Sequence, residues 1–210
     1  MIVLSHQFFP NNYFFSSLYK IIFLAPLFYG LILRKESFKK SLIKNFSLEK
    51  FKKNFAVTFF TGLSLSTIYL SSFFIFKDFI DIKSITDEIN KVASINLSNI
   101  IFIGAYIIIF NSILEEYFWR SFIFEELQKT IKPYLAYLIS ALAFSFHHVV
   151  FFYNWFTPTF FILITIGLVG YALIMNFIWK RYRELFSCWL PHAMVDVVQI
   201  FIAYQVFNSI

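Results

Sequence analysis

The chain has 210 residues, of which 59% are hydrophobic and 14% are charged, and its formal net charge is +6 at pH 7. Soluble domains are about half apolar and about a quarter charged, so this composition excludes an ordinary soluble protein and indicates a polytopic membrane protein. Nearly all of the chain lies in long apolar stretches or short connections, which leaves no room for a separate soluble domain.

We predict an all-α membrane bundle of six spans, because each apolar stretch is close to the roughly 20 residues that a helix needs to cross the hydrocarbon core. The stretches show no alternation of polar and apolar residues, which favours helices over a membrane barrel. The N-terminus lacks a basic segment followed by a small-residue cleavage site, so we expect the first span to be retained. The predicted spans are residues 13–33, 55–76, 100–124, 134–152, 159–179 and 185–207.

The charges of the connections predict the orientation. The connections after the first, third and fifth spans are basic, whereas the second is mixed and the fourth is uncharged. The positive-inside rule therefore places the basic connections in the cytoplasm and both termini outside. We expect this charge to attract anionic membrane lipids and not to bind nucleic acid. We also expect residues 81–97 to form a short amphipathic helix on the outer surface.

Two regions follow from this order. Residues 1–98 form an N-terminal two-span region with a basic cytoplasmic loop, and residues 99–210 form a membrane core whose four spans carry the chemistry. We expect a multi-pass protein of the bacterial inner (cytoplasmic) membrane. The lone Cys188 excludes an intramolecular disulfide, and we interpret it as a small apolar packing residue.

Ionisable side chains interrupt three of the apolar stretches in the second region. Burying such a group in hydrocarbon costs roughly 2.5–3.5 kcal/mol, so its presence there indicates a functional site. Carboxylates and imidazoles transfer protons or bind metals, which favours a membrane-embedded enzyme over a passive scaffold. The residues concerned are Glu115, Glu116, Arg120, His147, His148, His192 and Asp196.

The third predicted span carries two adjacent glutamates. Glu116 and Arg120 are i,i+4 neighbours on a helix and can form an ion pair. Glu115 lies about 100° further around the helix, where it can face a cavity and act as a general base. The alternative is that the ion pair only locks helix packing.

The fourth and sixth predicted spans carry the histidines. The spacing does not tell which of His147 and His148 faces Glu115. His192 and Asp196 are i,i+4 neighbours, about 6 Å apart on one face. Asp196 could orient His192 and fix its tautomer, or both could face a reacting oxygen. Alternatively, the pair only holds helices together.

The three groups are predicted to meet in space. Counting 1.5 Å per residue, Glu115, His148 and His192 lie roughly 14, 21 and 11 Å from the cytoplasmic ends of their spans. We therefore expect them to converge near the middle of the bilayer, in one cavity that opens to the cytoplasm.

The order Glu115-Glu116…Arg120, then Phe144…His148, then His192…Asp196 resembles the motif set of the CPBP (Abi) intramembrane endopeptidases. This family includes the type 2 CAAX prenyl endopeptidases and proteins for bacteriocin processing or self-immunity. The resemblance covers about residues 100–207.

The resemblance implies that Glu115 and His148 activate a water to attack the scissile carbonyl. His192 and Asp196 would stabilise the oxyanion, and Glu116 and Arg120 would hold the site together. An ionised Asp196 cannot donate a hydrogen bond, so it would have to be protonated or act by orienting His192.

The resemblance also implies hydrolysis without a metal. Zinc is the alternative cofactor, since two histidines and a glutamate can form a catalytic ligand set. The predicted function is hydrolysis of a peptide bond of a membrane-associated peptide or protein. A prenylated protein, a bacteriocin leader and a C-terminal sorting signal remain open as the substrate. The alternative functions are a non-catalytic scaffold or immunity protein and, less favoured, a proton-coupled transporter.

Overall fold

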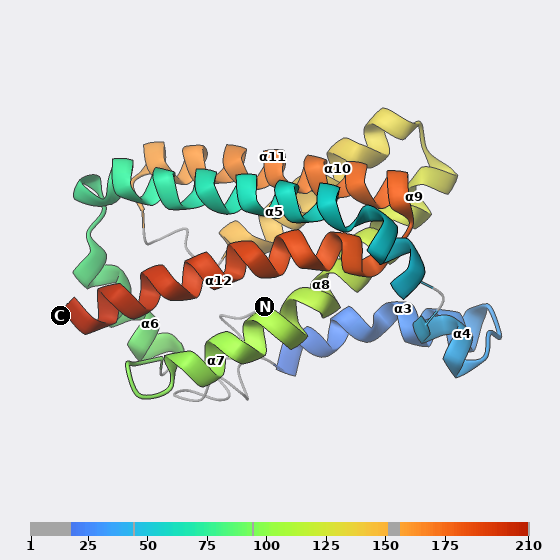
Figure 1. Ribbon diagram of the computed structural model, residues 1–210, viewed down its shortest axis with the longest axis horizontal. Coiled ribbons are helices and arrows are strands. Elements are labelled where there is room, and N and C mark those ends of the chain that lie inside the picture. Colours follow the sequence, from blue (N-terminus) through green and yellow to red (C-terminus); the bar gives the residue numbers. More distant parts are fainter. Residues whose placement is uncertain (1–17, 44, 94, 151–155, 210) are drawn as a thin grey trace.

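The computed structural model describes residues 18–43, 45–93, 95–150 and 156–209, and every regular element in these ranges is helical (Figure 1). The elements in chain order are η1 (Leu18–Leu24), α3 (Ala25–Phe28), η2 (Tyr29–Leu33), α4 (Phe38–Ile43), α5 (Leu48–Phe76), η3 (Lys77–Phe79), α6 (Ile82–Ala93), α7 (Ile100–Tyr106), η4 (Ile107–Asn111), α8 (Ser112–Phe118), η5 (Trp119–Phe124), α9 (Glu125–Thr130), α10 (Pro133–Val149), α11 (Pro158–Tyr182) and α12 (Leu185–Ser209). The prediction of an all-α membrane bundle is confirmed.

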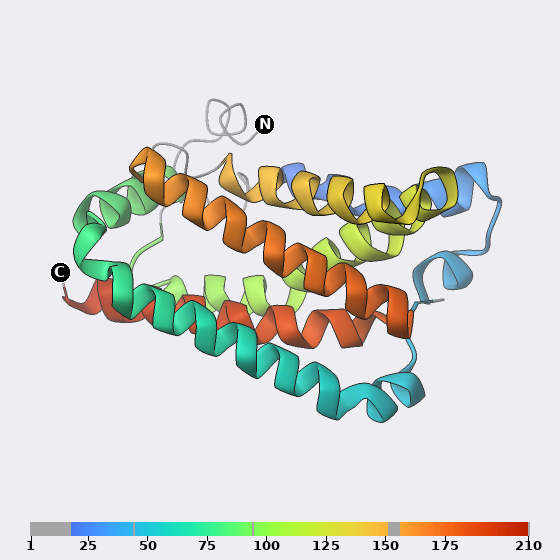
Figure 2. The ribbon, with the colours of Figure 1, turned by 90° about the horizontal axis from the view of Figure 1, so that it is seen from above.

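Long helices pair side by side in this bundle. Helix α5 runs along α12, and α10 runs along α11, as the two perpendicular views show (Figures 1 and 2). Helix α8 packs against α12 on the side away from α5 and also contacts η1. The middle of α12 is therefore enclosed by the N-terminal region on one side and by α8 on the other.

Four of the six predicted spans are helices that are long and apolar enough to cross a membrane. They are Leu48–Phe79, Ile100–Thr130, Pro158–Tyr182 and Leu185–Asn208. Large apolar side chains on these helices point outward, among them Phe102 with 78% of its surface exposed and Ile75 with 64%. Such a surface suits lipid and not water, and the chain is an integral membrane protein.

Within the described residues, the other two predicted spans are shorter than expected, and the count of six is not confirmed. The first apolar helix covers Ile21–Leu33, and the predicted residues 13–17 lie outside the described part of the chain. Helix α10 has 17 residues, or about 25 Å, less than the roughly 30 Å of a hydrocarbon core. It begins at Pro133, a residue suited to the first turn, and ends before the predicted limit at residue 152.

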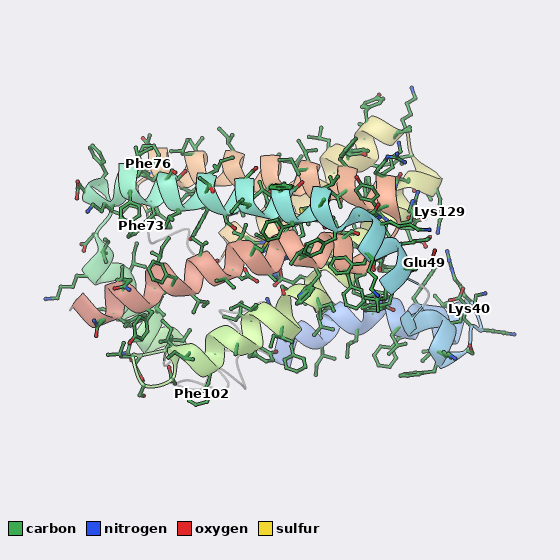
Figure 3. The ribbon with its side chains drawn as sticks, in the orientation of Figure 1. Lys40, Glu49, Phe73, Phe76, Phe102 and Lys129 are labelled. Carbon is green, nitrogen blue, oxygen red and sulfur yellow. The ribbon has the colours of Figure 1, made fainter. Side chains whose placement is uncertain are left out.

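The basic connections gather at one end of the bundle. Lys40 and Lys129 lie at this end, whereas Phe73 and Phe76 lie at the other (Figure 3). Arg34, in the first connection, forms a 2.8 Å ion pair with Glu126 of α9. The alternation of connections that the charges predicted is present, and α6 lies at the opposite end (Figure 1).

Helix α6 is amphipathic as predicted. Ile82, Ile85 and Ile89 are partly buried, while Asp81 and Asp87 are exposed. Apolar residues at i, i+3 and i+7 place one face of the helix against the bundle and leave the charged face outside.

Candidate active site

The helix that carries both glutamates is not a regular α-helix. Its α8 segment is flanked by two π-helical segments, η4 and η5. A π turn widens the helix and changes the direction of the side chains that follow, and such turns are frequent at functional sites. Trp189 of α12 donates its indole N–H to the carbonyl oxygen of Ile108 in η4 at 3.2 Å. A partner from another helix thus hydrogen-bonds a carbonyl within the π turn.

Glu115 is buried, with 4% of its surface exposed, and its two oxygens have different surroundings. Oε1 accepts a 2.7 Å hydrogen bond from Nδ2 of Asn111. Oε2 lies 3.4 Å from Nε2 of His148 and 4.0 Å from Nε2 of His192. One oxygen is therefore held by its own helix, and the other faces imidazoles from two other helices.

Glu116 is fully buried and holds two cationic or polar partners together. Its Oε2 accepts from Nε of Arg120 at 3.1 Å, and its Oε1 accepts from Nδ1 of His192 at 2.9 Å. The predicted Glu116–Arg120 pair is confirmed. Because a carboxylate oxygen can only accept, Nδ1 of His192 carries a proton. In the structure, Nδ1 of His192 donates its hydrogen bond to Glu116 and not to Asp196.

Arg120 is completely buried and is held on three sides. Besides Glu116, its Nη1 donates to Oδ1 of Asn176 at 3.4 Å, and its guanidinium lies 4.4 Å from the centroid of the Phe144 ring. Asn176 in turn donates to the carbonyl oxygen of Tyr137 in α10 at 3.3 Å. Arg120 thus connects η5, α10 and α11 behind the carboxylates.

The structure distinguishes the two adjacent histidines. His148 has Nδ1 at 2.9 Å from the carbonyl oxygen of Phe144, and its Nε2 faces Glu115. A carbonyl only accepts, so Nδ1 of His148 carries a proton, and Nε2 is the ring atom turned toward Glu115. His147 instead packs its ring against Phe23 at 5.3 Å and Trp119 at 5.8 Å.

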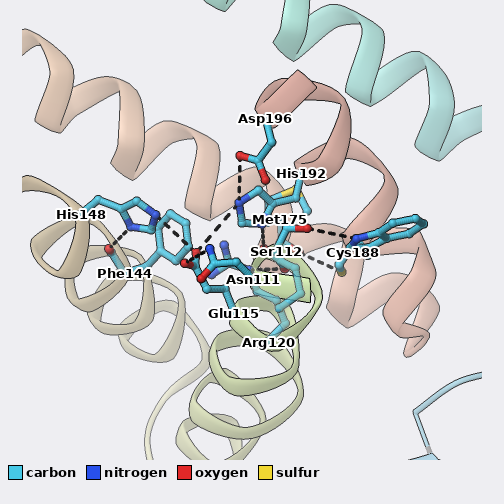
Figure 4. A network of polar contacts seen from close by, with 12 residues as sticks. Asn111, Ser112, Glu115, Arg120, Phe144, His148, Met175, Cys188, His192 and Asp196 are labelled. Atoms are coloured by element: carbon cyan, nitrogen blue, oxygen red, sulfur yellow. Dashed lines mark hydrogen bonds and ion pairs between the residues drawn. The ribbon is translucent and has the colours of Figure 1, made fainter. Parts of the chain in front are cut away.

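Asp196 lies on the far side of His192 from Glu116. Its Oδ1 is 3.8 Å from Nε2 of His192, which is longer than a hydrogen bond, and its Oδ2 is buried with no hydrogen-bond partner in the described residues. Figure 4 shows His148, Glu115, His192 and Asp196 in a row, with their polar atoms pointing toward one another. The segments that the sequence predicted to meet, in α8, α10 and α12, do meet.

The described residues contain no group of three or more His, Cys, Asp or Glu side chains arranged to hold a metal ion. The Nδ1 atoms of His148 and His192 are hydrogen-bonded, so Nε2 is the atom through which either histidine could bind a metal. Zinc therefore stays the alternative cofactor.

The comparisons with known proteins agree with this geometry. The family model described as type II CAAX prenyl endopeptidase Rce1-like matches residues 97–198, which include all the residues of the row. Residues 97–198 are therefore similar to the type II CAAX prenyl endopeptidases. No curated protein and no solved structure matches the chain significantly.

The Rce1-like region has further residues at its site that sequence reasoning did not identify. Asn111 contacts Glu115, Asn176 contacts Arg120, and Tyr171 lies with its ring 5.7 Å from that of His192. Asn111 precedes Glu115 by four residues, so helical spacing could have identified it. Tyr171 and Asn176 come from α11, whose apolar sequence contains no motif that points to the site.

An apolar groove of about 600 Å³ lies between α10 and α11 of the Rce1-like region. Its lining residues are Leu142, Ser145, Phe146, Val149, Val150, Phe161 and Thr165. The hydroxyl groups of Ser145 and Thr165 donate to carbonyl oxygens of their own helices, and the other lining residues in the described part of the chain are apolar. The expected opening of the site toward the cytoplasm stays a prediction.

Cys188 is fully buried in the core beside Met175 and Trp179, in agreement with its interpretation as a packing residue.

Proposed function

We propose that this membrane protease hydrolyses a peptide bond through a water activated by Glu115 and His148. The observation that carries the proposal is the position of Oε2 of Glu115, 3.4 Å from Nε2 of His148 and 4.0 Å from Nε2 of His192. An ionised Glu115 and a neutral His148 both present acceptors to the same place. A water there can donate one hydrogen to each and direct its oxygen lone pair at a substrate carbonyl.

The proton steps balance with these residues. Glu115 takes a proton as the water oxygen bonds to the carbonyl carbon, and it returns that proton to the amine as the C–N bond breaks. The negative charge on the carbonyl oxygen requires donors in a site that excludes water, where one such donor contributes ~3–4 kcal/mol. His192 and Asp196 are the proposed donors.

The contacts of His192 define what this role requires. Nδ1 already donates to Glu116, so Nε2 can donate to an oxyanion only when the ring carries both protons. The buried Glu116 carboxylate provides the opposite charge beside that form of the ring. Asp196 can donate only in its protonated form, through the Oδ2 atom that has no hydrogen-bond partner in the described residues.

The proposed setting is a bacterial inner membrane, with lipid around the bundle and a membrane-associated peptide or protein as the substrate. The family description supports a prenylated C-terminal CAAX peptide as the first substrate to test. Bacteriocin leaders and C-terminal sorting signals are the other candidates.

Comparative peptidomics of membranes tests the function without a chosen substrate. Cells that express either the wild type or Glu115→Gln at equal levels are compared, and we expect peptides that only the wild type releases. A scaffold would give identical peptide sets, and a transporter would lose flux in the variant without a peptide difference. Strong chelators should leave the wild-type activity intact, whereas inactivation that Zn²⁺ reverses would support the zinc alternative.

A further inference from the structure

Asn111 is the last residue of the π-helical segment η4 and lies one turn before Glu115. Only 7% of its surface is exposed, and its Nδ2 donates to Oε1 of Glu115 at 2.7 Å. Figure 4 shows the two side chains next to each other, on the side of the row away from Asp196. This hydrogen bond between buried groups is shorter than the distances from Glu115 to His148 and His192.

The orientation of the Asn111 amide follows from the charge of its neighbour. If the amide were reversed, Oδ1 would lie against a carboxylate oxygen, and two acceptors without a proton between them repel. The ionised form of Glu115 therefore requires Nδ2 on its side. Consequently Oδ1 points elsewhere, and it is buried with no hydrogen-bond partner in the described residues.

An acceptor in that situation is unfavourable, since buried polar atoms are nearly always paired. A leucine of similar size would fill the same space without an unpaired oxygen. Packing alone therefore does not explain an asparagine here, whereas its donor on Glu115 does.

The bond has a consequence for the geometry of the site. With Oε1 held by Asn111, rotation of the Glu115 carboxylate is restricted, and Oε2 stays toward Nε2 of His148. Without the bond, the glutamate side chain can rotate among several rotamers, only some of which face the histidine.

We propose that Asn111 is a positioning residue that holds Glu115 in the orientation in which it acts as the base. This inference rests on the proposed function of Glu115. The Asn111 side chain does not act on the substrate, so its effect belongs to the chemical step and not to substrate binding.

The test uses the full-length protein in detergent, a farnesylated CAAX peptide as the substrate, and the variants Asn111→Leu and Asn111→Gln. For Asn111→Leu we expect kcat to fall roughly 10- to 100-fold with KM unchanged, because a small misplacement of a reacting group has an effect of that size. Its melting temperature should stay near that of the wild type, because the loss of the donor to Glu115 and the removal of an unpaired buried oxygen act in opposite directions. Asn111→Gln keeps an amide donor and should retain more activity than the leucine variant.

The matched control is Ser140→Ala. Ser140 is also fully buried, and its hydroxyl has no hydrogen-bond partner in the described residues, but it lies on α10 about two helical turns before His148. Its removal should leave kcat unchanged. A rise in KM for Asn111→Leu at constant kcat would overturn the inference, because Asn111 would then contact the substrate.

A second measurement decides the question without any substrate. Melting temperatures are compared for Asn111→Leu, Glu115→Leu and the double variant. Each single variant already removes the hydrogen bond between Asn111 and Glu115, and the double variant cannot remove it again. The change in melting temperature of the double variant should therefore differ clearly from the sum of the two single changes. Additive shifts would overturn the inference.

The outcomes separate this inference from the proposed function. If Glu115→Gln retains the turnover of the wild type, the proposed function fails. If Glu115→Gln is inactive while Asn111→Leu has the kcat of the wild type, only the role of Asn111 fails.

Discussion

At the scale of single residues, the Glu116 carboxylate connects the side chains that surround the site. It is fully buried and accepts from Arg120 through one oxygen and from His192 through the other. A charge removed from water in this way is tolerated only when its partners are in place. We therefore expect Arg120 to act on the stability of the site and not on the substrate.

The first prediction follows from this burial. Arg120→Ala should lower the free energy of unfolding by ~3–5 kcal/mol, because it leaves the Glu116 carboxylate without its cation in a low-dielectric interior. The measurement is the melting temperature and the yield of the variant in detergent. The double variant Arg120→Met with Glu116→Gln should recover much of the stability, since no unpaired charge remains.

The exposed ion pair of Arg34 and Glu126 provides the control for this prediction, because about a third of each of these two side chains is accessible. Removal of Arg34 should change stability by only ~0–1 kcal/mol. An Arg120→Ala protein as stable as the wild type but inactive would show that the arginine faces the substrate.

Residue-scale contacts were predictable where they are local along a helix. The Glu116–Arg120 pair follows from the i,i+4 spacing alone. The partner of Nδ1 of His192 does not, because it depends on how α12 is rotated against α8. The choice between His147 and His148 also depended on the packing of Phe23 and Trp119, which no spacing reveals.

At the scale of elements, the π-helical segments on either side of α8 are the feature that the sequence did not predict. Residues 100–124 were predicted as one continuous span, and a continuous helix covers them. The run of isoleucines at 107–109 gives no signal of a π turn, and the hydrogen bond from Trp189 to Ile108 joins residues far apart in the sequence. The end of α10 was also mispredicted, because the apolar sequence continues beyond Val149, where the helix ends.

Helix α5 supports the site from outside the region that the family model matches. Gly62 of α5 faces α12 beside Pro191, the residue that precedes His192. A Cβ atom at Gly62 would lie 2.5 Å from Sδ of Met194 and 3.0 Å from Cα of Pro191. The flexible Met194 side chain can move, but the backbone at Pro191 cannot move without displacing His192.

The second prediction is that Gly62→Ala lowers both stability and activity. Overpacking of this kind typically costs ~1–3 kcal/mol. Activity should fall further than stability alone explains, because α12 is pushed at the turn that holds His192. Melting temperature and turnover of the purified variant measure the two effects.

Gly167→Ala and Gly170→Ala are matched controls on α11, since a Cβ at either position meets nothing within 4 Å. Each should leave activity unchanged and can stabilise the helix by up to ~1 kcal/mol. Wild-type behaviour of Gly62→Ala would mean that α5 and α12 separate without consequence for the site.

At the scale of the whole molecule, the connections alternate between the two ends of the bundle. The basic connections share one end, and α6 lies at the other (Figures 1 and 3). This alternation was predictable from the sequence, because hydropathy separates the spans from the connections and the lysines and arginines are concentrated in every second connection. The prediction that the N-terminus is outside falls on residues beyond the described part of the chain.

The third prediction concerns the orientation of the bundle in the membrane. Lys129 and Asp87, which are both exposed, are each replaced by cysteine in separate variants. Both variants also carry Cys188→Ala, which removes the only native thiol. A membrane-impermeant maleimide should label Asp87→Cys in intact spheroplasts and label Lys129→Cys only after permeabilisation. The reverse pattern would show that the basic end faces outward, against the positive-inside rule.

The central claim is that Glu115 and His148 act as one unit on a single water, and rate measurements on one peptide test it most directly. Turnover is compared for Glu115→Ala, His148→Ala and the double variant, with His147→Ala as the control from the neighbouring position. Each single variant should lose nearly all activity, the double variant should lose little more, and His147→Ala should keep most of it. Losses in Glu115→Ala and His148→Ala that multiply in the double variant would contradict a shared catalytic step.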